Sequence, residues 1–550
     1  LLQWMLVFLA VSLPLQAQET VVSPGLYRLF AKMEKNQQVT VVAIGGSITM
    51  HTTGWGRRIA KHLQDAYPQA PVRFVNAGVS GTGSSLGVFR LQRDVLAHRP
   101  DLVLVEYAVN DGGTPDLACI RNLESIVTRL RKCVSQPAIV FVESAARIGG
   151  KLDRHHRVAA HYGLMSVDMQ QACEVEMARE KLNWDDLLGD NVHPNGRGHG
   201  LYARVLWDRF QPYRKLPAVL PAIPKLPAPI SSDGLILNGT MITPNYEMAG
   251  WYYKSEKIAG WWRSFFEGSL QSTDKAETLH IPFYGRTIGL WLLVKSGRGK
   301  IRIAVDGQMV KEMSAFRPNW FYSQWIHSDL LKPDWHVLSI IPIGVNEDPA
   351  KVRIGYILAS DQTGAPAPSA DFWQTTWVQS RQRTKELTKL VYRVIPSDCW
   401  QVLAPFGGND AKPWEQPKVD LDRDYGVSPA VGPDTVSEFT GLRGKKIRWQ
   451  IASGENGWVD LRRMTGQYNR GVAYADVTLK APKAGDYEVR LAADYFVHIE
   501  VNGKPAGELM EHHGSPRNPV VRRLTLQEGE NRVRIKIHAG SMGFGFLVEY

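Results

Sequence analysis

The chain has 550 residues, of which 44% are hydrophobic and 22% charged, and its formal net charge is +11. This length is too great for one hydrophobic core, so we expect two to four domains. The basic residues are scattered and we find no nucleic-acid motif, which argues against a nucleic-acid partner. The four cysteines fit neither a zinc motif nor a disulfide framework, so we expect no metal and no cofactor.

The N-terminal stretch is typical of a secretory signal. An apolar run from Leu1 to Leu15 is followed by small and polar residues around Ala17, as in the apolar region and cleavage site of a signal peptide. A membrane anchor is the alternative, but a bilayer span needs about 20 apolar residues. We therefore predict a signal peptide over residues 1–18 and a secreted or periplasmic bacterial protein without stable membrane insertion.

Residues 19–211 alternate between apolar runs and helical patterns. The pattern predicts buried strands at 39–44, 72–77, 101–108, 138–143 and 164–169, with helices near 55–67, 88–98, 117–133, 152–162, 170–181 and 196–210. Such alternation predicts an α/β fold with a doubly wound parallel sheet, covered by helices on both faces. Ligands bind these sheets beyond the carboxyl ends of the strands. Ser47 follows the first strand and so falls at that edge.

Two proline-rich breaks divide the rest of the chain. Six prolines fall within residues 212–232, which favours an extended, semi-rigid spacer. Short strands and turns indicate a β-sandwich over 233–360, and the second break covers 361–371. Residues 372–550 begin with a helical piece at 378–394 and return to strands, which predicts a C-terminal β-sandwich. The stretches VDGQ at 305–308 and VNGK at 501–504 predict hairpin turns.

The tryptophans are concentrated in the two predicted sandwiches, because 13 of the 17 follow residue 220. Most large aromatic side chains belong to hydrophobic cores. A few exposed ones would form stacking platforms for sugar rings, whose C–H faces are apolar. We therefore regard the C-terminal sandwich as a candidate carbohydrate-binding domain.

The stretch VVAIGGSITM, residues 41–50, ends a buried strand with Gly45, Gly46 and Ser47. One interpretation is a tight turn in which the serine caps the following helix. The other is a nucleophile elbow, which lifts a serine hydroxyl clear of the sheet. The second interpretation requires a base, an orienting carboxylate and oxyanion donors elsewhere in the chain.

Candidates for these partners lie beyond later strands. GDNVHPNGRGH, 189–199, places Asp190 three residues before His193, so the carboxylate could hold the imidazole that accepts the proton of Ser47. NAGVSG supplies Gly78, whose backbone N–H could approach a substrate oxygen, and AVND supplies the side-chain amide of Asn110. Helix capping and ordinary turns are the alternatives. All these features fall at one edge of the predicted sheet, which favours catalysis.

In combination these blocks resemble the SGNH, or GDSL-type, hydrolase family. The stretches GGSIT, NAGVSG, AVND and DNVHP appear in the same order as the four blocks of that family. The resemblance covers residues 39 to about 210 and implies a flavodoxin-like doubly wound sheet. The family usually carries aspartate where this chain has Gly46, and glycine where it has Ala108. Both departures leave the reacting groups in place and point to a carbohydrate-esterase branch. A narrower similarity is to acetylesterases of bacterial polysaccharide utilisation, including the xyloglucan acetylesterase group.

The resemblance implies a mechanism and a substrate class. Ser47 is the nucleophile, His193 the base and Asp190 its orienting carboxylate, while the N–H groups of Ser47 and Gly78 and the amide of Asn110 form the oxyanion hole. The implied enzyme is a carbohydrate O-acetylesterase that deacetylates plant polysaccharide or its oligosaccharides. Two alternatives remain open: another SGNH activity, such as a lipase, thioesterase or sialate O-acetylesterase, and a noncatalytic glycan-binding protein.

Overall fold

The protein is described by a computed structural model of residues 23–549. The residues left undescribed within this range are 148–149, 151, 246–249, 256–264, 318–319, 328, 345–348, 362–364, 386, 388–394, 396, 408–422, 429–431, 435, 456, 467–470, 507–510, 513–519 and 540–543. The predicted signal peptide lies outside the described residues. The chain divides into two compact units: the first includes the residues up to Thr240 together with Asp329 and Leu330, and the second includes the other described residues from Met241 onward. Within the described ranges, no helix has both the length and the apolar character needed to cross a membrane.

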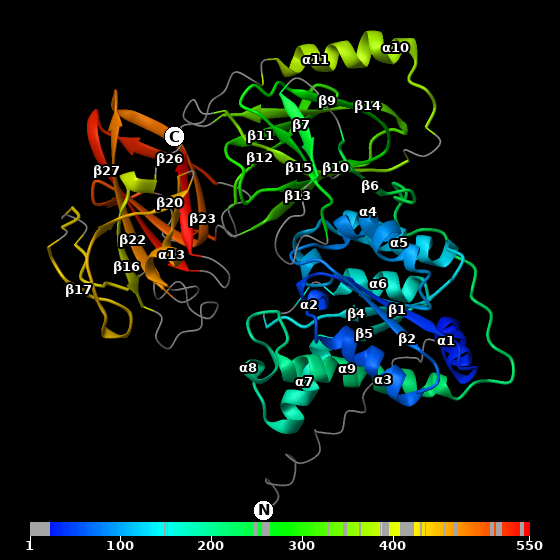
Figure 1. The fold of residues 1–550 in the computed structure, drawn as a ribbon. Coiled ribbons are helices and arrows are strands. Elements are labelled where there is room, and N and C mark those ends of the chain that lie inside the picture. The colour runs from blue at the N-terminus through cyan, green and yellow to red at the C-terminus, as the bar shows by residue number, and fades with distance from the viewer. Residues whose placement is uncertain are drawn as a thin grey trace, which may run out of the picture. The chain divides into compact units, whose positions relative to one another are not determined.

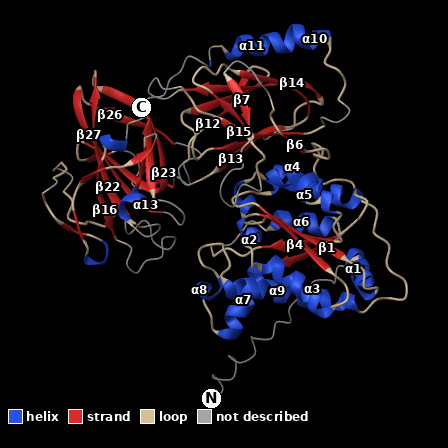
Figure 2. Cartoon of the chain, viewed as in Figure 1, coloured by secondary structure: helices blue, strands red, loops and turns tan. Residues whose placement is uncertain are grey.

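The first unit is built on a five-stranded parallel sheet (Figures 1 and 2). Its strands are β1 (Val39–Gly45), β2 (Val72–Gly78), β3 (Leu102–Glu106), β4 (Ala138–Glu143) and β5 (Met165–Asp168), in the order β2-β1-β3-β4-β5. Every residue of β1, β3 and β4 is buried, as expected for strands covered on both faces. The order is flavodoxin-like, so the predicted fold is confirmed. Its switch point lies where β1 and β3 end.

Helices cover both faces of this sheet (Figure 1). One face carries α4 (Ser84–Asp94), α5 (Asp116–Lys132) and α6 (Asp153–His161); the other carries α1 (Pro24–Glu34), α3 (Trp55–Ala66), α7 (Met169–Glu180) and α9 (Gly196–Phe210). The core on the second face includes Leu29, Ile59, Leu63 and Leu206. The short helices α2 (Ser47–Met50) and α8 (Trp184–Leu187) were not predicted, because a single turn shows no apolar periodicity. The longer helix α1 was not predicted either.

The proline-rich segment is bonded to the first unit through a buried carboxylate. Glu124 on α5 is fully buried and accepts hydrogen bonds from the N–H groups of Ile230 (2.6 Å) and Ser231 (2.8 Å) and from the hydroxyls of Ser231 and Tyr162. Further contacts are those of Arg121 with Asp233, Arg131 with the carbonyl of Pro224, and His161 with the carbonyl of Ala228. We call residues 212–233 the strap. Beyond the 3-10 helix η3 (Gln211–Arg214) it forms no helix or strand, and its hydrogen bonds dock it on the first unit.

The second unit begins with two antiparallel sheets that form a β-sandwich. One sheet has the order β13 (Tyr322–Ile326), β10 (Ile288–Leu293), β15 (Arg353–Ala359), β8 (Ser269–Ser272), β7 (Trp251–Lys254), and β6 (Thr240–Ile242) pairs with β15. The other has the order β12 (Gln308–Ser314), β11 (Lys300–Val305), β14 (Asp334–Ile343), β9 (Leu279–Gly285). Their shared core includes Leu290, Ile303, Leu338 and Ile354. The predicted hairpin at 305–308 is confirmed, with Asp306 and Gly307 at positive φ.

A second antiparallel assembly follows in the same unit, after α10 (Ala370–Phe372) and α11 (Val378–Thr384). Its main path is β19 (Gln450–Ile451), β16 (Gln401–Phe406), β22 (Val472–Ala481), β27 (Gly529–Ala539), β23 (Gly485–Val501), β28 (Gly545–Glu549), β21 (Trp458–Asp460), β20 (Gly454–Glu455). The first half of the long strand β23 pairs with β26 (Val520–Leu526), and its second half pairs with β27. This strand therefore connects the two parts of the assembly. The predicted hairpin at 501–504 is present. Most of the predicted helix beyond Thr384 lies outside the described residues.

Candidate active site

The nucleophile turn connects β1 to α2, and its glycines are required by the groups around it. Ser47 is the first residue of α2, directly after Gly46. A side chain on Gly46 would overlap the Oδ1 atom of Asn110. A side chain on Gly45 would overlap Thr49 and lie 2.8 Å from Oε2 of Glu106. Both glycines therefore make room for polar side chains packed against the turn.

Ser47, His193 and Asp190 form one continuous chain of hydrogen bonds. The Oγ atom of Ser47 lies 2.7 Å from Nε2 of His193, and Nδ1 of His193 lies 2.7 Å from Oδ2 of Asp190. Ser47 follows β1 and His193 lies in the loop between α8 and α9, and the two residues are 146 positions apart in sequence. The structure thus brings together the three residues predicted as nucleophile, base and orienting carboxylate.

The electrostatics of this pair suit a base and its partner. Burial raises the pKa of Asp190, but the hydrogen bond and charge of His193 and two backbone N–H groups outweigh it and lower the pKa to about 2. Burial lowers the pKa of His193, but the hydrogen bond and charge of Asp190 and the charge of Glu106 raise it above its ordinary value. Asp190 is therefore ionised at neutral pH, and it stabilises a proton on His193.

The loop that carries Asp190 and His193 is held on both sides. The Oδ1 atom of Asp190 accepts the N–H groups of Val192 and His193, each at 2.8 Å. The side chain of Arg147 donates to the carbonyl of Asp190 (2.8 Å). The cap of α9 is Asn195, whose Oδ1 accepts two N–H groups of the first turn. Since Asn195 caps the helix, the capping alternative does not account for Asp190.

Asn110 lies beside the nucleophile turn. It is the first residue of the 3-10 helix η2 (Asn110–Gly113), which follows β3 after three residues. Its Oδ1 atom faces the bare Cα of Gly46, closer than its Nδ2 atom, and the next residue anchors it. The carboxylate of Asp111 is fully buried, accepts the N–H of Ser84 at the start of α4 (2.8 Å) and contacts Nε2 of His155 (3.2 Å). The loop that carries Asn110 is therefore fixed to two helices.

Gly78 does not have the environment predicted for it. Its N–H donates to Oδ1 of Asn76 (2.9 Å), and a side chain on it would overlap the backbone of Met50. This glycine therefore lets β2 pack against α2, and its N–H is already engaged. Gly81, in the same loop, has a φ of 66°, and in the described structure no partner for its N–H is found. The motif NAGVSG holds both glycines, and the sequence alone did not separate them.

Glu106 is the polar residue at this edge that sequence analysis missed. It ends β3, is fully buried, and accepts hydrogen bonds from Thr49 of α2 (2.9 Å) and Ser144 after β4 (2.6 Å). Burial raises its pKa to about 7, against the hydrogen bonds from Ser144, Thr49 and Gly46. A glutamate at the end of an otherwise apolar strand, in VLVEYA, is the signal that could have revealed it.

One group in the described residues could supply metal ligands: Asp111, Cys119 and His155, all buried. The carboxylate of Asp111 already accepts the N–H of Ser84, and its Oδ2 faces both His155 and the thiol of Cys119 (3.6 Å). Burial raises the pKa of the Cys119 thiol well above its usual range, so it is present as a neutral donor. These mutual hydrogen bonds give the cluster a structural role beneath Asn110.

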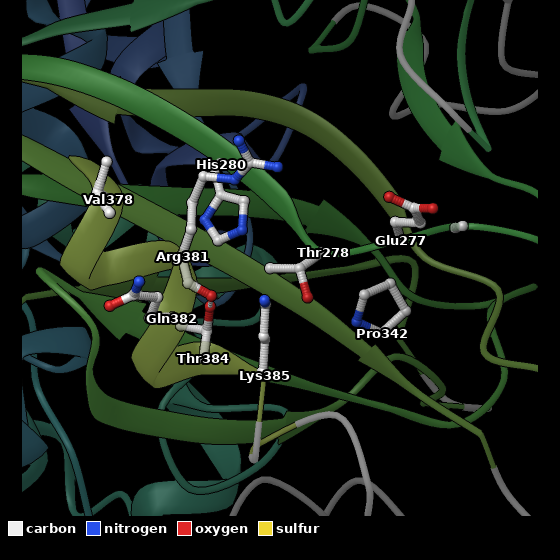
Figure 3. A pocket seen from close by; sticks show the side chains of 10 residues that line it. Glu277, Thr278, His280, Pro342, Val378, Arg381, Gln382, Thr384 and Lys385 are labelled. Atoms are coloured by element: carbon white, nitrogen blue, oxygen red, sulfur yellow. Dashed lines mark hydrogen bonds between the residues drawn. The ribbon is translucent and has the colours of Figure 1, made fainter. Parts of the chain in front are cut away.

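A separate pocket lies in the second unit, between the sandwich and α11 (Figure 3). Its volume is about 670 Å³, and its lining includes His280 of β9, Arg381 of α11 and the neighbouring Lys385. Burial and the charge of Arg381 lower the pKa of His280 to about 4, so this ring is neutral at physiological pH. The residues around the pocket offer polar groups rather than an aromatic platform.

Comparison with known proteins identifies the first unit. Residues 43–201 match the model of the GDSL-like Lipase/Acylhydrolase family. This segment is therefore similar to that family. The resemblance predicted from the four sequence blocks is therefore confirmed, and the blocks from Ser47 to His193 all fall inside the match. The match supports a carboxylic ester hydrolase.

Individual relatives point to the carbohydrate-esterase branch. An acetylxylan esterase of Geobacillus stearothermophilus is 25% identical over 179 residues, which cover 29% of this chain and 82% of that protein. A crystal structure of a two-domain esterase active on acetylated mannans, co-crystallized with mannopentaose, matches with a TM-score of 0.54 and 20% identity over 62% of this chain and 96% of the other. At this identity the structural match shows a shared fold.

Proposed function

We propose that this protein is a secreted serine esterase that removes O-acetyl groups from plant polysaccharide or its oligosaccharides. The observation that carries the proposal is the unbroken hydrogen-bond chain from Ser47 through His193 to Asp190 at the switch point of the sheet. Such an arrangement activates a hydroxyl for attack on a carbonyl. The family match and the acetylxylan esterase relative support the same reaction class.

The geometry supports a two-step acyl transfer. Oγ of Ser47 attacks the acetyl carbonyl carbon while Nε2 of His193 takes its proton, and Asp190 stabilises the resulting imidazolium. The tetrahedral intermediate then expels the sugar oxygen, which receives that proton from His193, and acetyl-Ser47 remains. In the second step His193 deprotonates a water molecule that attacks the acetyl group. Acetate leaves, and the proton returns to Ser47.

The oxyanion of each intermediate requires donors beside Ser47. We assign the N–H of Ser47, which lies at the start of α2, and the side-chain amide of Asn110, which packs against Gly46. For a further backbone donor we favour Gly81 over Gly78, because the N–H of Gly78 is donated to Asn76. Removal of one such donor typically lowers the rate about 10²- to 10³-fold.

The substrate class rests on the relatives and on the second unit. The acetylxylan esterase and the mannan-active two-domain esterase both act on acetylated polysaccharide, and xyloglucan is the polymer implied by the narrower sequence similarity. The predicted contribution of the β-sandwiches is to hold polysaccharide near Ser47. Trp373 of the second unit, 41% exposed, is one aromatic side chain available for sugar stacking.

Acetate release from a panel of polymers tests the proposal. Residues 19–550 would be assayed on acetylated xyloglucan, xylan, mannan and pectin, and on an aryl acetate and an aryl octanoate. We expect acetate from at least one plant polymer and a strong preference for the acetyl over the octanoyl ester. Ser47→Ala should release none. Preference for the octanoyl ester would indicate a lipase, and absence of activity on every ester would support the noncatalytic alternative.

A further inference from the structure

Glu106 connects the nucleophile turn to the neighbouring strand. Its Oε2 atom accepts the hydroxyl of Thr49 (2.9 Å) and faces the N–H of Gly46 (3.4 Å), while Oε1 accepts the hydroxyl of Ser144 (2.6 Å). Gly46 directly precedes Ser47, and Thr49 lies in the same single-turn helix. One buried carboxylate therefore fixes the segments before and after the serine and ties them to the end of β4.

The space around the turn is fitted to this carboxylate. A side chain on Gly45 would overlap Thr49 and lie 2.8 Å from Oε2 of Glu106. Glu106 is fully buried, so its oxygens take their hydrogen bonds from protein groups. Those donors are the turn itself and Ser144, so the carboxylate is in direct contact with the segment that carries Ser47.

The carboxylate also has an electrostatic effect on the base. Its hydrogen-bonding partners are neutral, so its charge is not cancelled by an ion pair. Three titratable groups interact with Glu106 through charge, so that the pKa of one partner is changed by the other. They are His193 of the site loop, His155 of α6 and Tyr202 of α9. The negative charge of Glu106 raises the pKa of His193, which Asp190 also raises. His199 is neutral at neutral pH, because burial and the charges of its neighbours lower its pKa to about 4.

We propose that Glu106 is a positioning residue for the proposed esterase: it fixes the turn that presents Ser47, and its negative charge favours the proton that His193 receives during attack. The inference rests on the proposed function. The acyl transfer needs both a hydroxyl held in line with the carbonyl and a stabilised imidazolium. Glu106 contributes to both without touching substrate, through Thr49 and Gly46 on one side and through its field at His193 on the other.

Glu106→Gln tests the proposal, since it removes the charge and keeps the side-chain volume. Glu143→Gln is the matched control, because Glu143 ends β4, is also fully buried, and contacts Ser166 and His156 instead of the nucleophile turn. We expect Glu106→Gln to lower kcat on an aryl acetate about 10- to 100-fold with little change in KM. Glu143→Gln should stay within about twofold of the wild type.

The pH profile separates positioning from a loss of structure. The base acts in its neutral form, so kcat/KM falls as the pH drops through the pKa of His193. Without the charge of Glu106 that pKa is lower, so the acidic limb of Glu106→Gln should move to lower pH. An unshifted limb, or equal losses in Glu106→Gln and Glu143→Gln, would overturn the proposal.

A stability measurement tests the buried charge independently of activity. The pKa of Glu106 is about 7 in the folded protein and 4.5 ordinarily, so the folded state binds the proton more tightly. The wild type should lose stability relative to Glu106→Gln as the pH rises from 4.5 to 7. Absence of this trend would contradict a buried ionisable carboxylate. An active Ser47→Ala variant would refute the proposed function, whereas an inactive Ser47→Ala with a fully active Glu106→Gln refutes only this inference.

Discussion

The carboxylate of Asp190 divides its two oxygens between His193 and the loop that carries both residues. Oδ2 lies 2.7 Å from Nδ1 of the imidazole, and Oδ1 accepts the backbone N–H of the same histidine at 2.8 Å. One side chain therefore sets both the position of the base and the orientation of its ring. Because Oδ1 holds the loop and Oδ2 holds the imidazole, a substitution of Asp190 can remove one function and keep the other.

Asp190→Asn should lower kcat/KM less than His193→Ala does. The asparagine keeps an oxygen for the backbone N–H groups of the loop but loses the charge that stabilises the imidazolium. We expect a loss of about 10³- to 10⁴-fold for Asp190→Asn and a larger one for His193→Ala. Initial rates on an aryl acetate would measure both. A His193→Ala variant with wild-type rates would rule out the triad.

Activity should decline on the acidic side at a pH above 6.5. Asp190 and Glu106 raise the pKa of His193, and only the neutral imidazole accepts the proton of Ser47, so activity is present above that pKa and is lost below it. Asp190, with a pKa of about 2, stays ionised throughout this range. A kcat/KM profile from pH 4 to 9 measures the limb, and a midpoint below 6 would contradict it.

Gly46→Ala should impair catalysis without unfolding the protein. The added methyl group overlaps Oδ1 of Asn110, so the amide must leave its place beside the turn. We expect kcat to fall about 10²- to 10³-fold, as for the loss of one oxyanion donor. Gly112→Ala is the control, because a side chain there has nothing within 4 Å. Equal activity of the two variants would show that Asn110 is not held by this contact.

Glu124→Ala should loosen the strap and destabilise the first unit. The change leaves the buried N–H groups of Ile230 and Ser231 and the hydroxyl of Tyr162 without their acceptor, at a cost of roughly 3 kcal/mol. Thermal unfolding followed by circular dichroism, and proteolysis within residues 217–229, would report the effect. Asp65→Asn, at an exposed ion pair with Lys61, is the control and should change little. Proteolysis of the variant at the wild-type rate would show that Glu124 does not hold the strap.

A fragment that ends at Thr240 should keep the chemistry and lose part of the activity on polymer. The fragment ends beyond the strap so that it keeps Ser231, whose N–H donates to the buried carboxylate of Glu124. If the second unit holds polysaccharide near Ser47, it raises the local substrate concentration and leaves the acyl transfer unchanged. We expect wild-type kcat on an aryl acetate and a lower rate on acetylated polymer. A parallel loss on both substrates in a folded fragment would contradict this tethering.

The local patterns of the first unit were sufficient to predict its strands and most of its helices. Buried strands such as β1 are unbroken apolar runs, and helices such as α3 and α6 carry clear apolar periodicity. The same edge of the sheet gathers Ser47, Asn110 and His193, so motif order predicted which groups would meet. Features that depend on distant partners were not predicted. The bond between Glu124 and Ser231 joins residues 107 positions apart, and nothing in the local sequence signals it.

The assignment of Gly78 shows a different limit. Gly78 ends β2 and Gly81 lies three residues later, and residue type alone does not distinguish them as donors. The distinction comes from Asn76, whose Oδ1 takes the N–H of Gly78 while its Nδ2 donates to the carbonyl of Thr49 (3.0 Å). These hydrogen bonds depend on how β2 and α2 pack, and packing is set by the whole unit.

The close approach of Asn110 to Gly46 has a consequence for the history of the chain. An aspartate in place of Gly46 would have to occupy space that the Asn110 side chain already fills. A side chain at position 46 therefore requires the Asn110 side chain to move, so the asparagine restricts what the turn can carry. Ancestral reconstructions that alter only position 46 should yield folded but impaired enzymes.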